Sequence, residues 1–296
     1  MKVRLLGTAA GGGFPQWNCA CAMCAACRTG APEVPARSQD CLAVSPQGTD
    51  WYLVNASPDI RSQVVSAPCL APGPGPRDTP LRGALLTDAE LDHTLGLMLL
   101  REGGGLSVWA PPAVLHALGE RFPIRDTVAR YGDWHWEPAG VSLGGLTVSA
   151  LGVSDKRPKY ARGSTVDGPW VVAYRLADPA TGGVLVYAPC LATWPPGFDE
   201  LVDGASCVLL DGTFFSPREM TGTGTSTAAQ HAMGHVPIDG PGGSLERIRA
   251  HAGSGTRWMY THLNNTNPVL DRRSPEYRRV CEAGVEVPED GTTLNL

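Results

Sequence analysis

Short apolar runs alternate with polar or glycine-rich stretches along most of the chain. Runs of this kind predict buried β-strands, here at residues 1–6, 51–54, 81–86, 106–109, 171–176, 183–187, 206–210 and 258–261. Helices are predicted from Ser57, over 95–100 and 112–118, from Ser244, and from Ser274 to Gly284. Strands and helices follow one another along the chain, so the pattern favours an α/β fold.

Three segments have the pattern of a β-hairpin, with apolar residues on both sides of a short turn. They are residues 141–153, 171–187 and 285–296, the last with Asp290-Gly291 at its turn. The glycine-rich stretch 7–13 lacks the spacing of a phosphate-binding motif. We therefore expect it to turn sharply beneath another element.

Polar residues that suit catalysis or metal binding stand where several predicted strands end. Asp92 and His93 follow one strand, Asp211 ends another, and His262 follows a third. His235 lies in a loop before the helix predicted at Ser244. Because α/β folds bring strand ends together, we predict that these five residues form one catalytic site.

Cysteines are concentrated near the start of the chain, where Cys19, Cys21, Cys24 and Cys27 lie close together. In a chain without a secretory signal this spacing favours Zn²⁺ over disulfides, although buried thiols without a metal are the alternative. The first three would bind a structural zinc. The fourth ligand could be Cys27 or a residue from elsewhere, for which Asn265 is a candidate.

We expect this zinc loop to span about residues 18–28. The remaining cysteines are scattered in mostly apolar surroundings and are interpreted as core thiols: Cys41, Cys69, Cys190, Cys207 and Cys281.

Residues 154–170 are rich in basic side chains and have little apolar periodicity. This segment is a candidate lid, with an ordinary solvated loop as the alternative. We predict that its cations bind an anionic substrate or cofactor at the mouth of the site; they are Lys156, Arg157, Lys159 and Arg162.

The composition narrows the possible classes of protein. The chain has 296 residues, of which 43% are hydrophobic, which allows one large domain. Its net charge of −5 gives no general affinity for nucleic acid. No apolar run is long enough to span a membrane, and the first residues do not resemble a signal peptide. We therefore expect a cytoplasmic protein.

Residues 88–93, Asp-Ala-Glu-Leu-Asp-His, resemble the first metal motif of the metallo-β-lactamase superfamily, His-x-His-x-Asp-His. Asp88 and Glu90 occupy the two His positions, while Asp92 and His93 match the motif. The superfamily also has a bridging Asp after the strand predicted at 183–187, where this chain has Ala-Pro-Cys. We therefore expect half of the usual two-metal site.

Further motifs resemble the pyrroloquinoline quinone (PQQ) biosynthesis protein B family. They are residues 11–19, 55–61, 92–94, 233–235 and 262–268. Because they extend over most of the chain, the resemblance implies one domain over residues 1–296. It implies the metallo-β-lactamase fold, an αββα sandwich of two mixed β-sheets with helices on both outer faces.

The superfamily resemblance also implies that Asp92, His93 and His262 bind one metal ion, with Asp88 as a weaker candidate. Asp211 and His235 would lie near its water or substrate. Two imidazoles and one carboxylate with open positions suit Fe²⁺ in oxygenases. Zn²⁺ or Mn²⁺ could occupy the same site in a purified sample.

The activity implied by the resemblance is iron- and O₂-dependent hydroxylation of the tyrosine ring of a Glu-Tyr unit to a catechol. The alternative is a carrier that moves PQQ or its precursor towards the periplasm. A metal-dependent hydrolase is less favoured, because both His of the first motif are replaced. Other PQQ biosynthesis proteins are possible partners, and a homodimer is expected.

Overall fold

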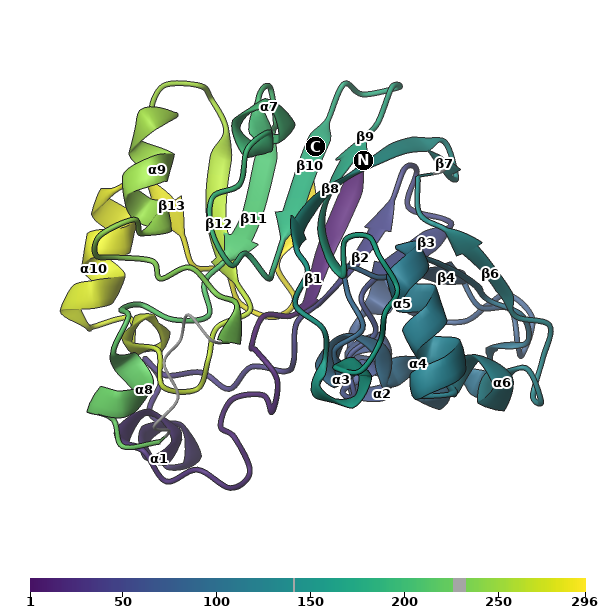
Figure 1. Ribbon diagram of the computed structural model, residues 1–296, viewed down its shortest axis with the longest axis horizontal. Helices are drawn as coiled ribbons and strands as arrows, with labels where there is room; N and C mark the ends of the chain where they lie inside the picture. The colour runs from purple at the N-terminus through teal and green to yellow at the C-terminus, as the bar shows by residue number, and fades with distance from the viewer. Residues whose placement is uncertain (141, 226–232) are drawn as a thin grey trace.

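The computed structural model describes residues 1–140, 142–225 and 233–296, and two seven-stranded β-sheets form its centre (Figure 1). In the first sheet the strand order is β14 (Thr293–Asn295), β1 (Lys2–Gly7), β2 (Cys41–Ser45), β3 (Trp51–Val54), β4 (Leu81–Leu85), β5 (Ser107–Ala110) and β6 (His135–Pro138). In the second sheet it is β13 (Val285–Glu286), β12 (Arg257–Thr261), β11 (Cys207–Asp211), β10 (Val184–Ala188), β9 (Val171–Ala177), β8 (Leu146–Ser154) and β7 (Ser142–Leu143).

Both sheets are mixed. In the first, β14, β1, β2 and β3 pair antiparallel, and β3 to β6 pair parallel. In the second, β7 to β10 pair antiparallel, and β10 to β13 pair parallel. Strands β2, β3, β10 and β11 are buried along their whole length, which explains their unbroken apolar sequences.

The two sheets pack face to face, and helices cover their outer faces (Figure 1). Side chains such as Leu42 and Val54 from the first sheet share a core with Tyr174, Leu209 and Met259 from the second. The helices that pack on the first sheet are α2 (Ile60–Ser66), α4 (Gly96–Leu99), α5 (Pro112–His116) and α6 (Ile124–Val128). Those on the second sheet are α7 (Phe198–Val202), α9 (Ser244–Ala250) and α10 (Pro275–Glu282).

This arrangement confirms the predicted αββα sandwich. The other α-helices in the described ranges are α1 (Ala22–Arg28), α3 (Leu91–Thr94) and α8 (Glu219–Gly222). None of the helices in the described ranges is long and apolar enough to cross a membrane.

The hairpin predicted at 285–296 is wrong. β13 pairs with β12 in the second sheet, whereas β14 pairs with β1 in the first. The segment between them crosses from one sheet to the other, and Asp290 accepts hydrogen bonds from Thr8 Oγ1 and the Ser38 backbone N–H. Partners distant in sequence therefore replace the local turn. The other two predicted hairpins are confirmed, apart from Val141, which lies outside the described residues.

Two serines predicted to cap helices do not do so, for a similar reason. α2 begins at Ile60 rather than at Pro58, because the Ser57 hydroxyl donates to Gln63 Oε1 and accepts from the Asp59 N–H. Ser244 does not cap α9 either, since its hydroxyl is bonded to the hydroxyl of Tyr260. The Ser274 cap of α10 is confirmed, with its Oγ accepting from the Tyr277 N–H.

Candidate metal centre

The predicted site residues come from both sheets. Short helix α3 follows β4 and carries Asp92 and His93, so these two residues lie on a helical turn rather than in a loop. His262 directly follows β12 and has a left-handed backbone, with φ of 56°. A non-glycine residue rarely adopts this conformation, and here it occurs at the residue that faces α3.

A cavity of about 770 Å³ opens between these elements. Its lining combines backbone near the glycine-rich loop with acidic, basic, thiol and imidazole side chains: Ala10, Gly11, Glu90, Leu91, Asp92, His93, Lys156, Arg157, Lys159, Tyr160, Arg162, Cys190, Thr213, Phe214, Met233, His235, His262 and Asn264. The cavity therefore holds most of the residues predicted to be functional.

Asp92, His93 and His262 converge at the base of the cavity. Asp92 Oδ2 lies 3.4 Å from His262 Nε2 and 3.9 Å from His93 Nε2. Both Nε2 atoms are buried and have no hydrogen-bond partner among the described residues. Burial would raise the pKa of Asp92, but the two imidazoles outweigh burial and hold that pKa well below its usual range.

The His93 ring is oriented by Asp88, whose Oδ2 lies 2.7 Å from His93 Nδ1. A carboxylate accepts here, so Nδ1 carries a proton, and Nε2 is the ring atom at which a metal ion could replace a proton. Asp88 also accepts from Thr87 Oγ1 and from the Glu90 N–H. The Asp88 carboxylate therefore lies on the Nδ1 side of the His93 ring, whereas a metal ion would bind at Nε2. This position suits a residue that orients His93 rather than the metal ligand that Asp88 was predicted to be.

The His262 ring is oriented by Thr213, whose Oγ1 lies 2.8 Å from His262 Nδ1. The Thr213 hydroxyl donates its single proton to Asp211 Oδ1, at 2.6 Å. It must therefore accept from His262 Nδ1–H, which leaves Nε2 free to bind a metal.

The residues present fit a divalent cation. Two unpartnered imidazole nitrogens and a carboxylate oxygen are the ligand types that Fe²⁺, Zn²⁺ and Mn²⁺ accept in proteins. Burial lowers the pKa of His93, but Asp88 and Asp92 outweigh it and raise that pKa to about 10. The surrounding carboxylates thus favour positive charge at this position, and a metal ion would replace the proton.

Asp211 and His235 form a network behind His262. His235 Nδ1 lies 2.8 Å from Asp211 Oδ2 and 3.0 Å from Thr213 Oγ1. These ligand-type atoms are already paired with one another, so the group made by Asp211, His235 and His262 is better described as a hydrogen-bond network than as a second metal site. His235 lines the cavity, whereas Asp211 lies outside the lining.

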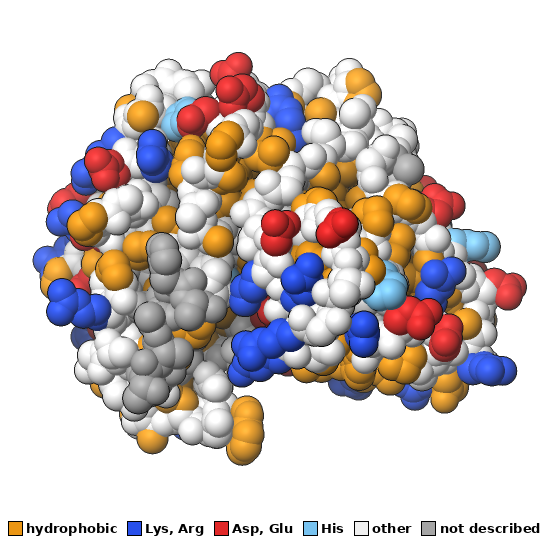
Figure 2. Space-filling view, viewed as in Figure 1, with side chains coloured by type: hydrophobic (Ala, Val, Ile, Leu, Met, Phe, Trp, Pro, Cys, Tyr) orange, Lys and Arg blue, Asp and Glu red, His pale blue; other side chains and the backbone are white. Residues whose placement is uncertain are grey.

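All four predicted cations line the cavity, and Figure 2 shows basic side chains gathered in the middle of this face, over the segment that follows β8.

Two of the four cations already interact with other residues of the protein. Lys156 Nζ donates to the Met233 carbonyl at 2.6 Å and lies 3.5 Å from Glu90. The Arg157 guanidinium lies over the Trp170 ring, 5.4 Å from its centroid. Lys159 and Arg162 are exposed and are therefore the cations available to a ligand.

The segment predicted as a lid is packed against the first sheet's outer core. The Tyr160 hydroxyl donates to the Ala89 carbonyl at 2.5 Å, and Ala161 and Trp170 are buried. The segment thus forms one wall of the cavity, and its movement as a lid stays a prediction.

The glycine-rich loop forms another wall. A Cβ at Gly11 would lie 2.9 Å from Asp92 Oδ2, and Gly12 and Gly13 have positive φ. As expected from the sequence, the loop turns sharply against another element, and the missing side chain leaves room for the Asp92 carboxylate.

The sulfur atoms of Cys19, Cys21 and Cys24 form a separate cluster, within 4.8 Å of one another. The side-chain amide of Asn265 faces them, with its nitrogen 3.2 Å from Cys19 Sγ and 3.4 Å from Cys24 Sγ. Cys27 lies outside the cluster. Burial raises the pKa of Cys24 to about 11, so this thiol keeps its proton unless a cation binds. Of the two candidates for a fourth ligand, Asn265 is the one that contacts the cluster, and it does so as a hydrogen-bond donor to the sulfur atoms.

Sequence reasoning missed Thr213, which orients His262, as well as Asp40 and Cys190. Asp40 is buried and accepts hydrogen bonds from Thr261 and Tyr187. Its carboxylate interacts electrostatically with His262 and His93, and no motif in the sequence indicates it. Cys190 was predicted to be a core thiol but lines the cavity, and its place after the strand at 183–187 was the available signal. Cys281 is exposed, which also contradicts its assignment to the core.

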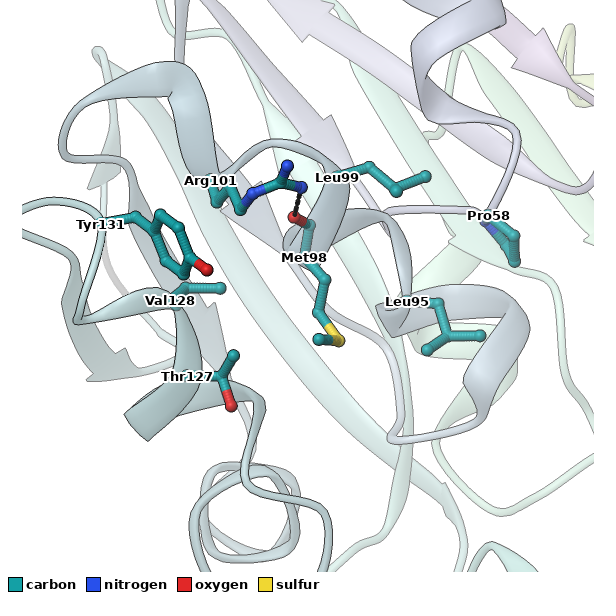
Figure 3. Close-up of a pocket in the computed structure, with 8 residues that line it drawn as sticks. All are labelled: Pro58, Leu95, Met98, Leu99, Arg101, Thr127, Val128 and Tyr131. Atoms are coloured by element: carbon teal, nitrogen blue, oxygen red, sulfur yellow. Dashed lines mark hydrogen bonds between the residues drawn. The ribbon is translucent and has the colours of Figure 1, made fainter.

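A second hollow, of about 450 Å³, lies over α4 and α6 (Figure 3). It is lined by Pro58, Leu95, Met98, Leu99, Arg101, Thr127, Val128 and Tyr131. The Arg101 guanidinium donates to the Met98 carbonyl at 3.2 Å and lies 5.5 Å from the Tyr131 ring centroid. None of these described lining residues is a His, Cys, Asp or Glu, so the hollow offers no comparable metal ligands.

Known proteins resemble the chain over its whole length. Residues 50–263 match the family described as beta-lactamase superfamily domain. Coenzyme PQQ synthesis protein B from Azoarcus sp. (strain BH72) is 39% identical, and that from Azotobacter vinelandii is 37% identical. Both comparisons cover 100% of this chain and 100% of the relative.

Solved structures agree with this relationship. Zn²⁺-bound PqqB from Methylobacterium extorquens has a TM-score of 0.91 and 33% identity, with 100% of each chain covered. A diphosphatase of the PhnP family has a TM-score of 0.67 and 18% identity, covering 99% of this chain and 96% of the other, and thus shares the fold. The resemblance inferred from the sequence motifs is confirmed. The chain belongs to the coenzyme PQQ synthesis protein B family, within the β-lactamase superfamily.

Proposed function

We propose that this chain acts in PQQ biosynthesis and hydroxylates the tyrosine ring of a Glu-Tyr unit to a catechol, with Fe²⁺ at Asp92, His93 and His262. The observation that carries the proposal is the pair of buried, unpartnered Nε2 atoms beside Asp92. The names of the full-length relatives support the pathway. The zinc in the M. extorquens structure supports binding of a divalent metal.

Asp92, His93 and His262 would hold the ion through one oxygen and two Nε2 atoms. When bound, iron would supply the capacity to activate O₂ for insertion into the ring. One oxygen atom enters a ring C–H bond. The other leaves as water with two protons and two electrons from an external reductant, for which ascorbate serves in the assay.

The chain's own residues would bind and orient the substrate. Lys159 and Arg162 are placed to attract the carboxylates of Glu-Tyr, since both are exposed at the cavity mouth. The wall that contains Tyr160 would limit the access of water. Asp211 and Thr213 accept from His235 Nδ1–H, so Nε2 is the ring atom that could take a proton from the substrate.

The test is a single turnover of the Fe²⁺-loaded protein with Glu-Tyr, O₂ and ascorbate. Wild type should yield a product heavier by one oxygen atom, as measured by mass spectrometry. His93→Ala and His262→Ala should abolish this product. His135→Ala, which replaces an exposed histidine of β6, should keep it. Hydroxylation that persists in both site variants would contradict the assignment.

A carrier of PQQ or its precursor is the second candidate. The observation that favours it is the size of the cavity together with its four basic lining residues, which suit a ligand with several carboxylates. Iron-loaded protein that adds no oxygen but binds PQQ tightly would support the carrier. The predicted cytoplasmic location, homodimer and contacts with other PQQ biosynthesis proteins stay predictions.

A further inference from the structure

Cys190 lies just beyond the carboxyl end of β10, in the group of strands that builds the metal centre. β10, β11 and β12 are adjacent and parallel, with Ala188 paired to Leu210 and Leu210 paired to Tyr260. The three strands therefore end at the same level. The residues that follow β10 and β12, Cys190 and His262, are delivered to one edge of the sheet.

The Cys190 sulfur lies near a ring nitrogen of each of the two histidines. Ligand atoms of His93, Cys190 and His262 all lie within 4.8 Å of one another. With a zinc–sulfur bond of about 2.3 Å and a zinc–nitrogen bond of about 2.0–2.1 Å, tetrahedral ligands of one zinc ion lie about 3.6 Å apart. One ion could therefore contact all three atoms after the side chains move closer by up to roughly 1 Å.

The backbone around Cys190 is fixed by the residues of the site. The Leu191 N–H donates to Asp211 Oδ2 at 2.7 Å, and the Val236 N–H donates to the Leu191 carbonyl at 2.6 Å. The same carboxylate that orients His235 thus also fixes the position of the thiol. Because Asp211 bonds both to His235 and to the backbone next to Cys190, Cys190 belongs to the hydrogen-bond network that surrounds the metal centre.

The surroundings of Cys190 disfavour a free thiolate. Burial raises the pKa of this thiol, and the carboxylates of Asp88, Asp211 and Asp92 raise it further by repulsion. A divalent ion held between the two imidazoles would cancel that repulsion and form a bond to the sulfur.

We propose that Cys190 is a fourth protein ligand of the metal centre, which gives a set of two imidazoles, one carboxylate and one thiolate. This inference rests on the metal centre proposed above and adds a ligand to it. A thiolate favours thiophilic ions such as Zn²⁺ and Co²⁺ over Mn²⁺. It also reduces the number of positions left for a substrate.

Titration of metal-free protein with Co²⁺ under anaerobic conditions tests the proposal, because a sulfur ligand gives cobalt a near-ultraviolet charge-transfer band. The cysteine cluster near α1 contributes equally in all variants, so difference spectra isolate the second site. Wild type should show the second-site band. Cys190→Ser should lose it and bind the second Co²⁺ about tenfold more weakly or worse. Cys69→Ser, a half-buried thiol outside the cavity, should behave as wild type.

Alkylation of wild type avoids the question of whether a variant folds. With iodoacetamide and peptide mass spectrometry, Co²⁺ should slow modification of Cys190 and leave that of Cys69 unchanged. His93→Ala should remove the protection. A second Co²⁺ that binds in a His93-dependent way, without the band and without protecting Cys190, would overturn the thiolate ligand and leave the proposed function intact. If no second Co²⁺ binds at all, both proposals are wrong.

Discussion

At the scale of single residues, the metal centre depends on which nitrogen of each histidine carries a proton. Asp88 fixes His93, and Thr213 fixes His262, so both rings present Nε2 to the cavity. Neither partner need touch the metal. Each acts by selecting a tautomer and a ring orientation, which makes it a positioning residue.

Thr213→Val should therefore weaken metal binding without removing a ligand. The substitution keeps the shape of the side chain but leaves His262 Nδ1–H without its acceptor. We expect roughly 10- to 100-fold weaker Zn²⁺ binding at this site, measured by competition with a chelator.

Thr213→Ser, which restores the hydroxyl, should recover most of the affinity, and Thr127→Val on exposed α6 should have no effect. If Thr213→Val binds Zn²⁺ as tightly as wild type, Thr213 does not position His262.

The two exposed cations at the cavity mouth should attract anionic ligands. Replacing both Lys159 and Arg162 by Gln should weaken PQQ binding by roughly threefold to tenfold at low salt, with a smaller difference at high salt. Fluorescence titration at two ionic strengths would measure this. Arg125→Gln with Arg130→Gln, an equal charge change on exposed residues outside the cavity lining, is the control. Equal losses of PQQ affinity in the two double variants would show that the net charge of the protein, rather than the cations at the cavity mouth, attracts the ligand.

At the scale of elements, the loop after β12 connects three parts of the molecule. His262 belongs to the metal centre, Asn265 faces the three clustered thiols, and Thr266 donates to Glu219 at the start of α8. Substitutions in the thiol cluster or in α8 should therefore alter the position of the loop that carries His262.

The thiol cluster should hold a structural zinc that fixes this loop. Cys21→Ala should release one zinc per chain and lower the melting temperature by about 5 °C or more, measured by metal analysis and calorimetry. Cys69→Ala should keep the zinc. A Cys21→Ala protein that retains both its zinc and its melting temperature would show that the cluster binds no metal.

Glu219 should make stability depend on pH. Burial raises its pKa to about 7 from the ordinary value of 4.5. Between these values the folded chain binds more protons than the unfolded chain, so stability falls as pH rises. Ionisation of Glu219 should cost wild type up to roughly 3 kcal/mol of its free energy of unfolding between pH 5 and pH 8. The Glu219→Gln variant should not show this loss.

Urea unfolding at the two pH values measures the difference between Glu219→Gln and wild type. Glu246→Gln, on the exposed side of α9, is the control. A wild type and a Glu219→Gln variant that lose the same stability over this range would contradict the buried, protonated state.

At the scale of the whole molecule, strands such as β3, β10 and β11 could be predicted because they are buried along their whole length and have apolar sequences. Asp92, His93 and His262 could be placed together because they follow such strands. Residues whose partners are distant in sequence could not be placed. Asp290 bonds to Thr8 and Ser38 instead of turning a hairpin, and the hydroxyl of Ser244 bonds to Tyr260 instead of capping its helix.

Cys190 shows the same limit within the site. In the sequence, a thiol that lines a cavity looks like a thiol in the core, because both follow an apolar run. The pairing of β10 with β11 is what shows that Cys190 lies at the cavity. Asp40 is a similar case, because its role depends on Tyr187 and Thr261 from the other sheet.

The central claim is that one metal ion, held by half of the superfamily's double site, serves oxygen insertion rather than hydrolysis. The most direct test is the origin of the oxygen atom in the product. Fe²⁺-loaded protein is given Glu-Tyr, ascorbate and isotopically heavy O₂ in ordinary water, and the product is analysed by mass spectrometry. We predict one heavy oxygen atom on the tyrosine ring, dependent on His93 and His262. A ring oxygen that comes from water, or a ring that gains no oxygen at all, would contradict the account.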